Sequence, residues 1–96
     1  MTKSQIEKCK QIAKYYGENA QMYVANEEAA EFMVAISKVW RDAPNADTQL
    51  LDGIADLLIM LYELMSYMDD DELTLMSKII NAKLDAQLDI IKKKEQ

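Results

Sequence analysis

The sequence contains no histidine and one cysteine, Cys9, among its 96 residues. Without histidine, the chain cannot form histidine-ligated zinc sites or use histidine as a catalytic acid or base. A single cysteine cannot form a disulfide within the chain, and low cysteine content is typical of proteins of a reducing cytoplasm. We interpret Cys9 as an ordinary helix residue, because no histidine is present to activate its thiol.

Glycine and proline are also scarce, with two glycines and one proline in the whole chain. Few breakers predict long elements, and the abundant residues, which include methionine, leucine, alanine, lysine and glutamate, are good helix formers. No segment has the pattern of a strand, and no linker is long enough to separate two domains. We therefore predict an all-α fold, an antiparallel bundle of about four helices that forms a single domain over residues 1–96.

A long uninterrupted apolar run is missing as well. A membrane-spanning helix needs roughly 18 consecutive apolar residues, whereas the most apolar window, residues 50–68, contains Asp52, Asp56 and Glu63. The first eleven residues are polar and charged, unlike a signal peptide. We expect a cytoplasmic protein with no membrane partner.

Positive charge is in deficit, since 17 acidic residues against 11 basic ones give a net charge of −6. This balance argues against a nucleic-acid backbone or an anionic membrane surface as the main partner. It remains compatible with a nucleotide that is bound through Mg²⁺. Half of the residues are hydrophobic, which is more than so short a chain buries by itself. We therefore expect a homo-oligomer.

Local signals divide the chain into four helices. Ser4 to Glu7 fits a capping box, Gly17 is a stop signal, Pro44 interrupts the middle of the chain, and Asp47 is a candidate helix cap. The apolar spacing between these signals predicts four helices, at about residues 5–16, 18–41, 48–68 and 71–93.

Asp56 is the most informative residue of the third expected helix. Every other residue between Gly53 and Tyr62 is apolar, and a helix that is apolar on all sides is normally buried. An ionised carboxylate in such a place is costly without a partner. Asp56 therefore needs a cation, which is either a lysine or arginine side chain or a metal ion.

Two pairs of carboxylates have the spacing of one helix face. Glu28 and Glu31 are three residues apart, and Asp52 and Asp56 are four apart. Glu28 and Glu31 alone fit either a solvated acidic face or a pair that holds a cation. A short loop predicts that the second and third helices pack antiparallel, which brings the two pairs together. Four oxygen ligands without histidine or cysteine indicate a site for Mg²⁺ or Mn²⁺.

These segments resemble the MazG-like, all-α nucleoside triphosphate pyrophosphohydrolases, whose hallmark is Glu-x-x-Glu followed by Glu-x-x-Asp. The matching segments are Tyr16-Gly17, Gln21, Glu27-Glu28-Ala29-Ala30-Glu31 and Leu51-Asp52-Gly53-Ile54-Ala55-Asp56-Leu57-Leu58-Ile59-Met60-Leu61. The resemblance implies a helical homo-oligomer, either a dimer or a tetramer, that cleaves a nucleoside triphosphate to its monophosphate and pyrophosphate. It implies that Glu28, Glu31 and Asp56 bind Mg²⁺ with help from Asp52, and that Glu27 or Glu28 orients the attacking water.

The sequence departs from the family pattern at three positions. Gly53 replaces the glutamate of the second half-motif, and Ala86 and Ile90 stand where arginines are common. Lys83 matches a basic residue of the family, so it either binds phosphate or pairs with Asp56. Asn81 is either a ligand contact or an exposed helix residue. The alternative function is therefore a MazG-like binding or assembly module with weakened or lost catalysis.

Overall fold

The computed structural model describes residues 1–96, which form four α-helices and no strand. The helices are α1 (Lys3–Tyr16), α2 (Glu18–Trp40), α3 (Ala46–Met65) and α4 (Asp70–Glu95). The prediction of an all-α chain with four helices is confirmed. None of the four is both long enough and apolar enough to cross a membrane.

The starts of two helices differ from the prediction. Thr2, not Ser4, caps α1: its hydroxyl accepts a hydrogen bond from the backbone N–H of Gln5 at 3.1 Å, and the Gln5 side chain accepts one from Thr2. The capping-box spacing occurs twice in this segment, and the earlier copy gives a longer helix. Asp47 was the wrong cap for α3, which begins at Ala46 after Asn45 in a left-handed conformation.

The junctions between helices follow the local signals. Gly17 separates α1 from α2 with a φ of 90°, a conformation that glycine adopts without strain. The third helix ends at Met65, three residues earlier than predicted, and a turn follows. Asp69 then caps α4, because its carboxylate accepts a hydrogen bond from the Glu72 backbone N–H at 2.8 Å.

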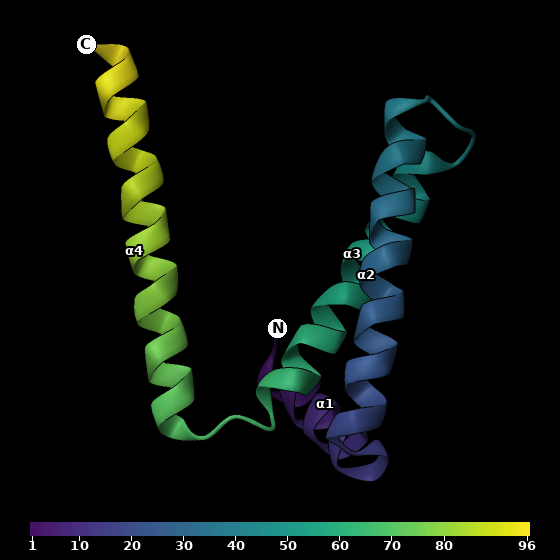
Figure 1. The fold of residues 1–96 in the computed structure, drawn as a ribbon. Helices are drawn as coiled ribbons and strands as arrows, with labels where there is room; N and C mark the ends of the chain where they lie inside the picture. The colour runs from purple at the N-terminus through teal and green to yellow at the C-terminus, as the bar shows by residue number, and fades with distance from the viewer.

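The main packing unit is the antiparallel pair of α2 and α3, with α1 across its lower end (Figure 1). Two long-range hydrogen bonds tie this end together: the Gln21 amide donates to the Glu63 carboxylate at 3.2 Å, and the Tyr67 hydroxyl donates to the Ala13 carbonyl at 2.6 Å. The core is small. Its buried apolar residues are Cys9, Ala13, Ala35, Ala46 and Met60.

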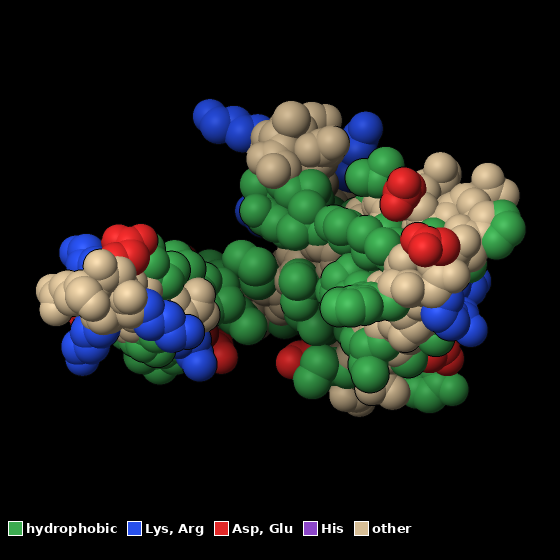
Figure 2. Space-filling view, turned by 90° about the horizontal axis from the view of Figure 1, so that it is seen from above, with side chains coloured by type: hydrophobic (Ala, Val, Ile, Leu, Met, Phe, Trp, Pro, Cys, Tyr) green, Lys and Arg blue, Asp and Glu red, His purple; other side chains and the backbone are tan.

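The last helix, α4, stands apart from this unit (Figure 1). It makes no extended contact with the other helices, and none of its residues is buried. Seen from above, hydrophobic side chains cover the part of the packed helices nearest α4 and the adjoining side of α4 itself (Figure 2). Within one chain, the packed bundle therefore consists of α1, α2 and α3, whereas we had expected the fourth helix to join it.

Candidate functional site: a carboxylate face between two helices

The hydrogen bond between Gln21 and Glu63 defines how α2 and α3 are aligned. In an antiparallel pair, moving seven residues forward along α2 corresponds to moving seven residues back along α3, about two turns of each helix. This step leads from Gln21 to Glu28 and from Glu63 to Asp56. The pairing at the lower end of the hairpin thus brings the two acidic segments of the sequence opposite each other.

The electrostatics of Glu28 confirm that the carboxylates lie close together. Partial burial raises the pKa of Glu28 above its ordinary value, and the negative charges of Glu31, Asp56, Asp52 and Glu27 raise it further, in that order. Three of these five residues come from α2 and two from α3. No lysine or arginine is among the groups that shift this pKa. Glu28 is therefore surrounded by repelling charges, and no basic side chain neutralises it.

Asp56 itself is half-buried, not sealed in an apolar core. The other sides of α3 carry apolar residues that remain exposed in the single chain, among them Leu51 and Leu61. A single chain thus leaves much of α3 uncovered, which agrees with the expectation that so short a chain can hardly cover this helix alone. The side of α3 that faces α2 is the one that carries the acids.

A groove of about 430 Å³ runs along the α2–α3 contact above the cluster. Its lining residues are Ala30, Glu31, Val34, Ala35, Lys38, Gln49, Asp52, Gly53 and Asp56. Lys38 is the only basic residue in this lining. Gly53 lies against Phe32 and Ala35, and a Cβ atom added there would be 3.6 Å from the Ala35 Cβ. This is ordinary van der Waals contact, so position 53 has room for a side-chain Cβ.

The donor set of the cluster suits a hard cation such as Mg²⁺, since every candidate ligand is a carboxylate oxygen. No three acidic side chains stand in positions that would hold a metal ion together. Mg²⁺ does not require such a cage, because it usually keeps several waters and is bound through one or two carboxylates and the phosphates of a substrate. The residues present therefore fit Mg²⁺ that arrives with a phosphate ligand.

A second space, of about 400 Å³, lies at the lower end of the hairpin beside α1. Gln21, Glu28, Asp56 and Glu63 supply its polar lining, and its apolar walls include Tyr16. Asp56 lines both this pocket and the groove, so the two spaces meet at that residue.

Glu63 is the most deeply buried charged residue, with 2% of its surface exposed. Burial raises its pKa above the ordinary carboxyl value. Its charge also contributes, after burial, to the raised pKa values of the Cys9 thiol and the Tyr67 hydroxyl.

The sequence analysis did not single out Glu63, Gln21 or Lys38 as candidate site residues. A seven-residue step could have found all three, since Gln21 precedes Glu28 by seven, Glu63 follows Asp56 by seven, and Lys38 follows Glu31 by seven.

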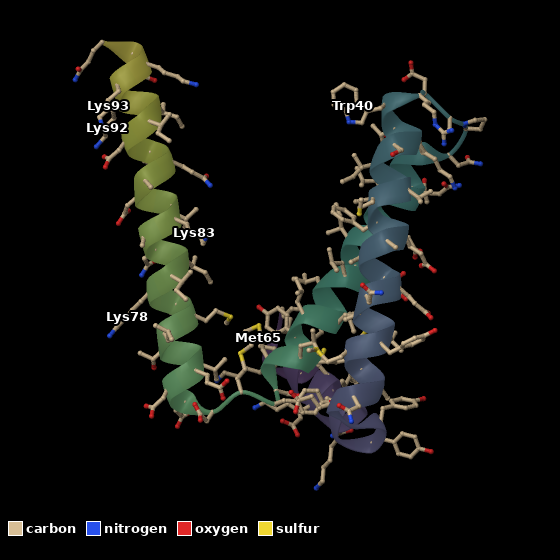
Figure 3. The ribbon with its side chains drawn as sticks, viewed as in Figure 1. Trp40, Met65, Lys78, Lys83, Lys92 and Lys93 are labelled. Atoms are coloured by element: carbon tan, nitrogen blue, oxygen red, sulfur yellow. The ribbon has the colours of Figure 1, made fainter.

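Lys83 and Asn81 lie on α4, which makes no extended contact with α2 or α3. Figure 3 shows Lys83 on that separate helix. A single chain therefore brings together Glu27, Glu28, Glu31, Asp52 and Asp56 but not the two candidate ligand contacts of α4. Ala86 and Ile90 are also exposed on α4.

Searches of protein-family models, of curated proteins and of solved structures each found no match to this chain.

Proposed function

We propose that this protein is a Mg²⁺-dependent, MazG-like nucleotide pyrophosphohydrolase that cleaves a ribo- or deoxyribonucleoside triphosphate to the monophosphate and pyrophosphate. One observation carries the proposal: α2 and α3 bring five carboxylates together, and no lysine or arginine is among the groups that shift the pKa of Glu28. Such a cluster is unfavourable alone and favourable around a divalent cation.

The proposed roles follow from the MazG-like resemblance, which assigns Mg²⁺ to Glu28, Glu31 and Asp56 with help from Asp52. Because no three of the acids converge on one point, one or two of them would bind the ion at a time, and waters and substrate phosphates would complete its coordination. Bound Mg²⁺ would neutralise phosphate charge and lower the pKa of a coordinated water. Glu27 or Glu28 would orient the attacking water and accept its proton.

Lys38 adds a role that the sequence analysis did not assign. It lines the same groove as Glu31 and Asp52, and its ammonium group can pair with a phosphate oxygen as a point charge. The triphosphate would then lie along the groove, with its terminal phosphates towards Lys38.

Assembly is the second part of the proposal. The apolar residues of α4 at 80, 84, 88 and 91 are each 47–55% exposed, although their spacing is that of one buried helix face. A second copy of the chain would cover this face with its own apolar surface and give a homo-oligomer. Lys83 lies three residues after Ile80, beside that face, so a neighbouring copy could receive Lys83 and Asn81 at its carboxylate site.

The alternative is a helical binding or assembly module that retains the scaffold without turnover. Gly53 supports this alternative because it offers no carboxylate to the groove, and Ala86 and Ile90 offer no charge to a phosphate. The exposed apolar surface of α4 fits both functions.

Pyrophosphate release distinguishes the two functions. The assay would compare ribo- and deoxyribonucleoside triphosphates with Mg²⁺, with Mn²⁺ and with a chelator. The proposal predicts release from at least one triphosphate that needs the metal. No release from any of them, by a folded and oligomeric protein, would favour the assembly module.

A further inference from the structure

We propose that the pocket between α1, α2 and α3 binds the base of the nucleotide, and that Glu63 and Gln21 select a guanine through its two adjacent N–H donors. This inference rests on the proposed function, since it assigns the base that accompanies the triphosphate.

The floor of the pocket consists of two polar side chains that are almost fully buried. Glu63 is 2% exposed and Gln21 is 4% exposed, and both line the pocket. The Gln21 amide nitrogen donates to one carboxylate oxygen of Glu63 at 3.2 Å. No protein group hydrogen-bonds the other carboxylate oxygen of Glu63 or the amide oxygen of Gln21, yet the protein has no sealed polar atom without a partner. Both oxygens therefore retain a small accessible surface, and both residues line the pocket.

Two oxygens without a protein donor, on side chains that hydrogen-bond each other, suit a ligand that donates hydrogen bonds. A buried carboxylate with a single neutral partner is costly, and a ligand with two N–H groups would supply the missing bonds. A phosphate group placed against Glu63 would be repelled, because Glu63 carries a buried carboxylate and is not among the proposed Mg²⁺ ligands. The part of the ligand that enters must be rich in donors and carry no negative charge.

The walls favour a flat ring over an aliphatic amine. Tyr16 forms one side, and Ile12, Val24 and Met60 form much of the remainder. Aromatic and apolar side chains stack on nucleobases, whose edges are then read by hydrogen bonds. The volume of about 400 Å³ lies within the range of small-molecule sites. Among the common bases, guanine presents two adjacent donors on one edge, N1–H and the 2-amino group.

The position of the pocket next to the groove also fits the binding of a base. Asp56 lines both the pocket and the groove. A nucleotide with its base beside Glu63 would therefore have its phosphates near Asp56. The groove then continues to Lys38. The base and the triphosphate would thus occupy two spaces that share Asp56. The pocket adds Gln21, Glu28 and Glu63, and the groove adds Glu31, Asp52 and Lys38.

The experiment compares guanine with hypoxanthine, which lacks only the 2-amino group. Pyrophosphate release from GTP and ITP would be measured with Mg²⁺, and binding of GMP and IMP would be measured separately by calorimetry. A hydrogen bond to a charged, buried acceptor predicts that kcat/KM for GTP exceeds that for ITP by about 10- to 100-fold. GMP should bind more tightly than IMP by a similar factor.

The variant Glu63→Gln tests whether the carboxylate makes this distinction. The new amide keeps the size of the side chain and can still accept the hydrogen bond from Gln21, so the fold should persist. The preference for guanine should fall to within about threefold, while the rise in melting temperature caused by Mg²⁺ stays as in the wild type. Glu7→Gln, which neutralises an exposed carboxylate of α1, is the matched control and should leave the preference unchanged.

The outcomes separate the two proposals. Pyrophosphate release with equal use of GTP and ITP would overturn the base assignment and leave the proposed function intact. Absence of release with a clear preference for GMP over IMP, lost in Glu63→Gln, would support the pocket and overturn the hydrolase. Absence of release together with equal binding of GMP and IMP would overturn both.

Discussion

The α2–α3 pair and α4 are both long helices with apolar residues, but they differ in what they contact. The pair is held by tertiary contacts, including the Gln21–Glu63 hydrogen bond. In contrast, α4 has 26 residues, none of them buried. Its local signals are complete, with a capping box at Asp69 and Glu72, acids in the first turn and three lysines in the last turn. These signals favour a helix without any partner.

This difference indicates that the proposed site and the proposed assembly surface lie on different helices. The α2–α3 pair brings chemistry-bearing residues from two segments to one face, and this face is the proposed site. The fourth helix brings nothing to that face within one chain. Its exposed apolar residues instead suit a surface that a second copy covers. The site and the assembly surface therefore occupy different helices and can be disrupted separately.

The largest expected effect comes from breaking the α4 surface. Replacing Leu84 and Leu88 with glutamate puts two charges into the apolar row, and burying them in an interface is costly. We expect self-association to weaken by about 100-fold or more, as measured by sedimentation at tens of micromolar. The control is Asp85→Lys on the polar side of α4. A wild-type protein that is monomeric at this concentration would contradict the assembly proposal.

A smaller effect is expected from restoring the missing carboxylate. Gly53→Glu places an acid three residues before Asp56 on the same face, and the surroundings of Gly53 accept a Cβ atom. We expect Mg²⁺ to bind about tenfold more tightly, a change of roughly 1.4 kcal/mol, with raised pyrophosphate release. Calorimetric titration with Mg²⁺ measures the affinity.

Gly53→Ala is the matched control for this change. It removes the same helix-weakening glycine, which costs roughly 1 kcal/mol relative to alanine, but adds no ligand. Both variants should therefore be more stable than the wild type, and only the glutamate should bind the ion more tightly. Weaker Mg²⁺ binding in Gly53→Glu would contradict this prediction. It would show that Asp52 already supplies the carboxylate that Gly53 lacks, and that the added glutamate repels the other carboxylates.

The smallest effect concerns Glu63 and pH. Because burial raises the pKa of Glu63, the folded chain holds this proton more tightly than the unfolded chain. The contribution of Glu63 to stability is therefore greatest in acid and is lost as pH rises from the ordinary carboxyl pKa of 4.5 through the raised value. Glu63→Gln removes this dependence. We expect its melting temperature to exceed that of the wild type by about 2–5 °C at pH 7 and to match it in acid.

Thermal melts of both proteins from pH 4 to pH 8 measure this difference. Of the neighbouring groups that Glu63 influences, Cys9 and Tyr67 stay neutral over most of this range, because the pKa values of both are raised. A constant difference between the two proteins at all pH values would show that Glu63 does not titrate with a raised pKa.

Much of the fold could be predicted from local patterns, and part of the site could be predicted from spacing. The four helices follow from composition, Gly17 and the break before Asp69, since these act within a few residues. The meeting of Glu28 with Asp56 follows from one antiparallel pairing. The wrong cap at Ser4 has a local cause, because Thr2 offers the same capping-box spacing two residues earlier. At α3 no side chain caps the helix, which begins after Asn45 in a left-handed conformation.

The remaining features depend on tertiary contacts that no local pattern reports. The burial of Glu63 and Gln21 requires α1 to cross the end of the hairpin, and the sequence of α1 does not indicate where it crosses. The separation of α4 could not be predicted either, because an apolar row looks the same whether its partner lies in the same chain or in another copy.

The most direct test of the account is Mg²⁺ binding by the wild type, Asp56→Asn and Asp85→Asn. Asp56 links both halves of the carboxylate face, whereas Asp85 is an exposed acid on α4. Calorimetry and thermal melts should show that millimolar Mg²⁺ binds and stabilises the wild type and Asp85→Asn, and that Asp56→Asn loses both effects. Equal binding by Asp56→Asn would contradict the account, because the ion would then bind away from the face that α2 and α3 form.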